Sequence, residues 1–419
     1  MDLGPYGSGQ PHGIGSGRCD ERADQVAQFP RCAVADRDGE PVLSDPAAPA
    51  ALRLQQTSGM VMAKGVEDCA FYRSSRLTSL NEVGGDPSIF AVSPAEFHDA
   101  MVIRQATRPD AMTALTTHDT KRGEDVRARI SVLAEIPEVW EQALDGLLTR
   151  APVPDPAFGS LLWQAVLGAW PGSLYGDPPG DLRDRLHAYA EKAMREAGDH
   201  TTWTDPDPAY EKAVHAAVDA AFDDAPTRVV LADLLDRIVR HGWTNALVTK
   251  LVAITAPGVC DVYQGSELWE QSLVDPDNRR PVDFDRRREV LGDLDATASP
   301  ALLSGAEDYG NAKLWVTRTA LRLRRDRRDL FSTYTSLESH GSAAEHVLAF
   351  DRGGAVTVGT RLPVRLEEQG GWGDTTLRLP PGRWRDLLAG DRSGDVLSGD
   401  VWLKDLLSEL PVALLVKES

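Results

Sequence analysis

The order of the expected elements is the sequence feature that most constrains the fold. An apolar run, Met112 to Thr117, predicts a buried strand, and the charged segment Gly123 to Ala134 after it predicts a helix. A long helical stretch, from about Glu138 to Arg240, separates this pair from a second short strand within TAPGVCDVYQGSELW. Because strands that alternate with helices form parallel sheets, this order predicts a βα architecture with a helical insertion.

The segments before and after this βα unit show other sequence patterns. Helices are expected over Pro94 to Gln105 and Ala312 to Arg325. The blocks QQTSGMVMAKGVEDCAFYR and LTSLNEVGGDPSIF mix short apolar runs with glycines and charges, which is typical of loops above a buried sheet. The C-terminal runs EHVLAF, AVTVGTRL and TTLRLP, separated by Gly, Pro and Asp turns, predict a small antiparallel β domain.

Charge and cysteine content narrow the function classes. A net charge of −19 argues against nucleic acid or an anionic membrane as partner, because phosphate binding needs clustered Lys and Arg, whereas a neutral ligand is compatible. The four cysteines are scattered without a C-x-x-C pair, so neither disulfides nor a structural metal are expected. The N-terminus lacks the pattern of a signal peptide and no apolar run is long enough to span a membrane, which predicts a cytoplasmic location.

The pair His118 and Asp119 follows the first expected strand directly. In a βα barrel these side chains would lie at the C-terminal mouth, where loops build active sites. The alternative is that Asp119 caps the helix that follows, since Asp is a favoured N-cap.

Other candidates lie in the glycine-containing blocks and in the run DPDNRRP. Acidic side chains there could form the carboxylate pairs of glycoside chemistry or could simply be solvated. The aromatic residues could stack on a sugar or pack the barrel rim. Arg279 and Arg280 could donate to substrate hydroxyls or pair with Asp275 and Asp277. The acidic candidates are Glu67, Asp68, Glu82 and Asp86, and the aromatic ones are Phe71, Tyr72, Tyr263 and Trp269.

Several long motifs carry a resemblance to one enzyme family. MAKGVEDCAFYR, SLNEVGGDP, THDTKRGEDVRAR, KAMREAGDHTTWTDPDPAYE and PGVCDVYQGSELWEQSLVDPDNRRPVDF, followed by KLWVTRTALRLRR, GWGDTTL and LPVALL, resemble the C-terminal half of maltooligosyltrehalose synthases. These enzymes are intramolecular transglucosylases of the α-amylase family (glycosyl hydrolase family 13). The likeness runs from about Arg53 to the C-terminus.

The resemblance implies a fold, a reaction and roles for single residues. It implies the C-terminal part of a (β/α)8 barrel with a helical insertion, and isomerisation of the reducing-end α-1,4 bond of a maltooligosaccharide or glycogen-derived glucan to α,α-1,1, a step of trehalose biosynthesis. Asp119 would be the transition-state stabiliser, and His118 would hydrogen-bond the glucose at the cleavage point. No metal or organic cofactor is implied. Further candidate glucan contacts are Lys64, Glu67, Lys121, Arg122, Tyr263, Arg279 and Arg280.

The family's nucleophile and acid/base are expected upstream of the MAKG block, farther away than the sequence extends. The nucleophile of the family lies in a G-x-R-x-D pattern, and SGRCDER, with Arg18 and Asp20, is a poor match to it. We therefore expect a chain that lacks these two acids. Three alternatives remain open. The chain could be a non-catalytic glucan-binding remnant, or it could be a half that a separately encoded N-terminal barrel half completes. The third alternative, an α-amylase-type hydrolase, is disfavoured by the family-specific motifs.

The sequence patterns and the resemblance together predict five segments. These are an irregular, disordered or frameshifted segment over 1–51, a barrel segment over 52–135, a helical insertion over 136–241, the last barrel strand with helices over 242–330, and the β domain over 331–419.

Overall fold

The computed structural model describes residues 49–171, 180–296, 309–390 and 395–418. The chain divides into two compact units, Met1–Lys64 and Gly65–Ser419. In the first unit, the described residues form α1 (Pro49–Val61) and the start of a π-helical segment, Met62–Ala70. The expectations for residues 1–48, including the candidate Asp20, fall outside the described residues.

The block that follows Leu52 is helical, which corrects the expectation of loops. The π-helical segment leads into a short helix, α2 (Phe71–Arg73). Ala, Leu, Gln and Met have high intrinsic helix propensity, and this outweighs the cost of Gly59 and Gly65. Added side chains at both glycines would meet no atom within 4 Å, so neither marks a tight turn.

The central βα unit contains two parallel strands. β1 (Met112–Ala114) pairs with β2 (Val259–Asp261) in the register Thr113 to Cys260. A barrel is not confirmed by these two strands, and β1 is shorter and less buried than expected, since Met112 is 78% exposed. Helix α3 (Pro94–Thr107) precedes β1, which confirms the helix expected over Pro94 to Gln105, and it begins with a capping box of Ser93 and Glu96.

Helices form most of the region between the two strands. α4 (Glu124–Ile130) continues into a 3₁₀ turn, and α9 (Ala225–Thr255) is one continuous helix that crosses the expected segment boundary at residue 241. The side chains of these helices form the largest apolar core, around Leu161 and Trp163. The other helices of this region are α5 (Pro137–Arg150), α6 (Pro156–Ala169), α7 (Leu182–Ala197) and α8 (Pro208–Asp223).

Two helices follow β2 and lead to the C-terminal domain. α10 (Phe284–Ala296) and α11 (Tyr309–Asp326) pack with the second half of α9 around Leu251 and Trp315. The expected helix over Ala312 to Arg325 is therefore present. None of the helices in the described ranges is long and apolar enough to cross a membrane.

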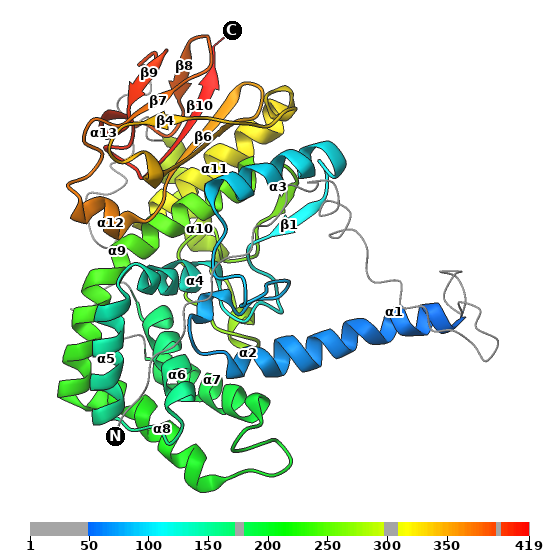
Figure 1. Cartoon of the computed structure of the whole chain (residues 1–419), viewed down its shortest axis with the longest axis vertical. Coiled ribbons are helices and arrows are strands. Elements are labelled where there is room, and N and C mark those ends of the chain that lie inside the picture. The colour runs from blue at the N-terminus through cyan, green and yellow to red at the C-terminus, as the bar shows by residue number, and fades with distance from the viewer. Residues whose placement is uncertain (1–48, 172–179, 297–308, 391–394, 419) are drawn as a thin grey trace, which may run out of the picture. The chain divides into compact units, whose positions relative to one another are not determined.

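The C-terminal domain is antiparallel, as the sequence predicts. A five-stranded sheet in the order β3-β5-β6-β10-β8 faces a three-stranded sheet in the order β4-β7-β9, and α9 passes beneath β6 and β10 (Figure 1). The strands are β3 (Thr335–Ser336), β4 (Ser339–His340), β5 (Val347–Asp351), β6 (Ala355–Thr360), β7 (Thr376–Arg378), β8 (Trp384–Asp386), β9 (Asp400–Trp402) and β10 (Val412–Lys417). Two short helices, α12 (Pro363–Glu368) and α13 (Leu403–Leu406), lie between strands of this C-terminal domain.

Candidate functional site

A tight turn over residues 117–120 follows β1 and carries the His-Asp pair. Thr117 Oγ1 accepts from the backbone N–H of Asp119 at 3.2 Å, and Thr120 Oγ1 accepts from the N–H of Thr117 at 2.6 Å. Short hydroxyl side chains stabilise such turns because they replace backbone acceptors. The turn leaves His118 exposed and the Asp119 side chain 51% exposed.

Asp119 is not a helix cap. α4 begins at Glu124, its N-cap is Gly123, and no side chain caps it. The structural alternative raised by the sequence is therefore wrong, and the exposure of Asp119 needs another explanation.

Asn278, from the loop after β2, holds this turn from below. Its Nδ2 donates to the carbonyl oxygens of His118 at 3.0 Å and of Thr117 at 3.3 Å, and the side chain is buried. The carbonyl of Asn278 in turn accepts from the hydroxyl of Tyr263 at 3.2 Å. The DPDN run thus positions the His-Asp backbone, a link between distant segments that periodicity could not predict.

Lys121 connects Asp119 to a second carboxylate. Its Nζ lies 2.8 Å from Asp68 Oδ1 and 3.5 Å from Asp119 Oδ1, and the lysine side chain is only 2% exposed. Asp68 lies on the π-helical segment and is 17% exposed. The ammonium of Lys121 is therefore a buried cation that two carboxylates share.

Arg122 lies in the interior beneath the turn. It is 1% exposed, donates to Tyr189 Oη at 2.7 Å, and its guanidinium stands 5.8 Å from the centre of the Tyr189 ring. Burial raises the pKa of both Tyr189 and Tyr72, so both phenols are neutral. Tyr72 Oη and Arg122 Nε have no hydrogen-bond partner within the described ranges.

Glu82 fixes the backbone that carries these two cations. Its carboxylate accepts from the N–H of Lys121 at 3.0 Å, of Arg122 at 3.2 Å and of Val83 at 2.8 Å. Glu82 is therefore a structural carboxylate. Asp86, by contrast, is exposed and forms a local turn with Ser88, whose hydroxyl proton it accepts at 2.7 Å.

A buried cluster of four charges supports the strand ends. Glu124 pairs with Lys250 at 2.7 Å and Lys313 at 2.9 Å, and Lys313 pairs with Asp125 at 2.7 Å. Burial raises the pKa of Glu124, but the two lysines outweigh it and hold that pKa at about 2. Glu124 also accepts from Thr116 Oγ1 at 3.2 Å, which ties the cluster to the residue preceding the turn.

Arg129 does not share in that cluster, although it is spaced i,i+4 from Asp125. It donates to the carbonyl oxygens of Leu167 at 3.2 Å and Gly168 at 3.3 Å. Burial lowers its pKa to about 10, against the attraction of Asp125.

The two arginines of DPDNRRP have acidic partners within the protein. Arg279 pairs with Asp275, while Arg280 Nε lies 3.1 Å from Asp277 and its NH2 group lies 3.3 Å from Glu270. The pairing alternative is thus confirmed for both. Their side chains are 52% and 40% exposed, so one edge of each guanidinium still faces solvent.

The aromatic candidates mainly contribute packing. Phe71 and Tyr72 are 3% exposed, and Trp269 stacks on Trp243 with ring centres 6.0 Å apart. Tyr263 remains half-buried beside Asn278.

Two further candidate glucan contacts, Lys64 and Glu67, precede Asp68 in the sequence. Glu67 is half-buried and makes no hydrogen bond or ion pair with another described residue. Lys64 ends the other compact unit, so the structure does not place it relative to Asp119.

Within the described ranges, no group of three or more His, Cys, Asp or Glu side chains is arranged to hold a metal ion. At the turn, the exposed side chains of Asp119 and His118 offer a carboxylate and a ring nitrogen to a ligand, while Lys121 remains buried behind Asp119.

Comparison with known proteins finds maltooligosyltrehalose synthases and a glycosyltrehalose synthase. No protein-family profile matches the chain. It is 47% identical over 386 residues, 91% of this chain and 46% of the relative, to a putative maltooligosyl trehalose synthase of Mycobacterium tuberculosis. The structure of maltooligosyltrehalose synthase from Arthrobacter ramosus matches with a TM-score of 0.83 and 48% identity, over 90% of this chain and 48% of that one. A DSM5389 glycosyltrehalose synthase matches with a TM-score of 0.71 and 30% identity, over 89% of this chain and 46% of that one.

Proposed function

The chain is a homologue of the maltooligosyltrehalose synthases that spans about half their length, and we propose that it contributes the Asp119 side of such an active site. In this proposal the substrate is a maltooligosaccharide. The reaction moves its reducing-end glucose from an α-1,4 to an α,α-1,1 bond.

The observation that carries the proposal is the half-exposed Asp119 on a turn held from three sides. Thr117 holds its N–H, Asn278 holds the adjacent carbonyls, and Lys121 lies 3.5 Å from its carboxylate. Glycosyl transfer passes through an oxocarbenium-like transition state. A fixed carboxylate that binds the sugar hydroxyls more strongly as positive charge develops lowers the barrier selectively.

The neighbours of Asp119 take supporting roles. His118 is exposed next to it and would hydrogen-bond the glucose at the cleavage point. Lys121 would position Asp119 through its shared contact with Asp68, and Arg122 would support the floor beneath Lys121. Lys64, Glu67, Tyr263, Arg279 and Arg280 remain proposed glucan contacts.

The fold part of the proposal is an α-amylase-type (β/α)8 barrel. The parallel pairing of β1 with β2 supports it, because consecutive strands of such a barrel are parallel neighbours joined through helices. Residues 52–135 and 242–330 would contribute to the barrel, 136–241 would be the insertion and 331–419 the β domain.

The nucleophile and the acid/base of a retaining mechanism are two carboxyl groups about 5 Å apart. The described residues bring one further carboxylate, Asp68, to Lys121, and it is committed to that ion pair. We propose that the other two acids belong to sequence outside the described residues, either in the same polypeptide or in a separately encoded N-terminal half.

Product analysis tests the proposal. The 419-residue chain is incubated with maltopentaose, alone and together with the part of the Arthrobacter ramosus enzyme that it does not match. A synthase consumes reducing ends without releasing glucose in equal amount, whereas a hydrolase creates new reducing ends. Release of new reducing ends would contradict the proposal.

The alternative to this proposal is a chain that binds glucan without turnover. Its signature is calorimetric binding of maltopentaose with reducing ends unchanged under both conditions.

A further inference from the structure

A second cavity lies away from the His-Asp turn, between α9 and the C-terminal domain. It encloses about 450 Å³, which is within the range of small-molecule sites. Three segments line it: the middle of α9, the segment from Thr360 through α12 to Trp372, and residues 407–411 before β10. Neither Asp119 nor a neighbour of it lines this cavity.

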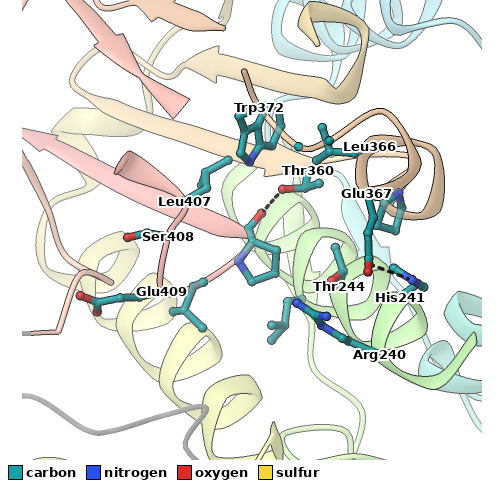
Figure 2. A pocket seen from close by; sticks show the side chains of 16 residues that line it. Arg240, His241, Thr244, Thr360, Leu366, Glu367, Trp372, Leu407, Ser408 and Glu409 are labelled. Atoms are coloured by element: carbon teal, nitrogen blue, oxygen red, sulfur yellow. Dashed lines mark hydrogen bonds and ion pairs between the residues drawn. The ribbon is translucent and has the colours of Figure 1, made fainter. Parts of the chain in front are cut away.

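The lining combines buried apolar side chains with a polar rim. Leu247, Leu366 and Leu410 are its buried apolar members. Around them stand the cation Arg240, the hydroxyl of Thr244 and the carboxylate of Glu367, which lies 3.5 Å from His241 Nε2. Figure 2 shows these polar side chains and Trp372 around the opening.

Trp372 is presented by a rigid turn. The N–H of Gly370 donates to Glu367 O at 3.0 Å and that of Gly371 to Leu366 O at 2.8 Å, with φ of 92° and 84° at the two glycines. These angles belong to the left-handed region that only glycine adopts without strain. The turn ends α12 and leaves the Trp372 side chain half-buried, with one part of the ring in the core of the β domain.

The charges on the rim argue against an anion or a metal as ligand. The guanidinium of Arg240 has no ion pair or hydrogen bond with a described residue, but carboxylates of Glu367 and Glu409 share the rim. Burial, reinforced by Arg240, lowers the pKa of His241 although Glu367 opposes the shift, so this imidazole is neutral at neutral pH. The cavity therefore offers neutral hydrogen-bond donors and acceptors next to a guanidinium and carboxylates. Vicinal hydroxyl groups fit such a lining because each of them both donates and accepts hydrogen bonds.

We infer that this cavity is a second binding site for a neutral oligosaccharide, with Trp372 as the apolar platform and Arg240 as a hydroxyl ligand. An indole offers a flat apolar face and a polar edge, which matches the two kinds of surface on a sugar ring. The assignment of the sugar as an α-1,4-glucan rests on the proposed function; its being neutral and hydroxylated rests on the lining.

The site shares a helix with the charge cluster beneath the His-Asp turn. Arg240 precedes Lys250 on α9 by about 15 Å of helix axis. Lys250 pairs with Glu124, which binds Thr116. A glucan held at this cavity would therefore contact the helix that also carries Lys250.

The test is ¹⁹F NMR of the full chain labelled with 5-fluorotryptophan and titrated with maltoheptaose. Trp372→Phe and Trp402→Phe assign two of the ten tryptophan resonances. Trp402 is the matched control, since it is 45% exposed on β9 and does not line the cavity. We expect the Trp372 resonance to shift and saturate, the Trp402 resonance to stay, and Arg240→Ala to weaken the Trp372 response about tenfold.

Other outcomes separate this inference from the proposed function. A Trp372 shift that persists in Asp119→Asn supports a second site whether or not the chain turns over glucan. Turnover of glucan with no Trp372 shift overturns the second site and leaves the proposed function standing. Equal shifts of Trp372 and Trp402 show nonspecific contact and also overturn it.

Discussion

Lys121 Nζ donates to Asp68 Oδ1 at 2.8 Å, and this contact joins the π-helical segment to the turn after β1. The same ammonium lies 3.5 Å from Asp119, the residue proposed to act on the substrate. The two carboxylates therefore share one buried cation, and the geometry of Asp119 depends on a residue far from it in the sequence.

Replacement of Lys121 by methionine tests this dependence. The variant removes a charged hydrogen bond from Asp68 and keeps the apolar volume, so we expect a loss of about 1.5–3 kcal/mol in the free energy of unfolding. Urea denaturation measures it. Lys404→Met is the control, because Lys404 is exposed; an equal loss in both variants would contradict the bridging role.

Asn278→Leu removes the donor that holds the turn. The carbonyls of His118 and Thr117 lose a buried partner, and we expect a cost of about 1–3 kcal/mol together with faster amide exchange over residues 117–120. Hydrogen exchange by mass spectrometry reads the turn directly. Gln369→Leu at an exposed helix end is the control. Unchanged exchange in Asn278→Leu would show that the turn holds itself.

Lys313→Met leaves Glu124 and Asp125 buried with one lysine between them. Removing one partner of a buried pair costs about 3–5 kcal/mol, because the remaining charge is uncompensated. The exposed pair of Arg327 and Asp329, with side chains 48% and 64% exposed, provides the control in Arg327→Met, for which a much smaller loss is expected because solvent screens the pair. Similar midpoints for both variants in urea would refute the importance of the cluster.

His187 and His215 predict a loss of stability on mild acidification. Their Nδ1 atoms lie 2.9 Å apart, so one proton fits between them. Burial and then His187 lower the pKa of His215, although Glu191, Glu211 and Asp219 oppose the shift. A folded-state pKa below the unfolded value of 6.5 means that the unfolded chain binds more protons, so stability present above pH 6.5 is lost as the pH falls below it.

The measurement is the melting temperature at pH 7.5 and pH 5.5 for the wild type and His215→Gln. We expect the wild type to lose more on acidification than the variant. The other histidines with lowered pKa, His98 and His241, are present in both proteins and cancel. Identical pH slopes would contradict the prediction.

Local patterns predicted much of the fold but not its connections. The helix α3 was predictable because Ser93 and Glu96 form its cap within four residues. The segment after Leu52 was wrongly expected to form loops, because its glycines occupy open positions on a helix rather than turns. The segment boundary expected after residue 241 falls inside α9, where Trp243 packs into the helical core.

For the candidate site too, local patterns pointed to some residues but not to the partners that hold them. His118 and Asp119 were chosen as candidates because they follow an expected strand, and their neighbours Lys121 and Arg122 came with the family resemblance. The partners that position them did not, because Asn278 and Glu82 reach the turn from segments 160 and 39 residues away in the chain. The cluster of Glu124, Lys250 and Lys313 was missed for the same reason, since no periodic pattern links charges on three separate helices.

The role of Asp119 is tested most directly by the rate at which maltopentaose loses reducing ends in the presence of the chain and the complementary part of the Arthrobacter ramosus enzyme. Asp119→Asn keeps the shape and removes the charge, and Asp145→Asn makes the same change at an exposed position on α5. We predict that Asp119→Asn lowers the rate about 10²- to 10³-fold while Asp145→Asn leaves it unchanged. An Asp119→Asn chain as active as the wild type, or a folded wild-type mixture that leaves the reducing ends untouched, would contradict the account.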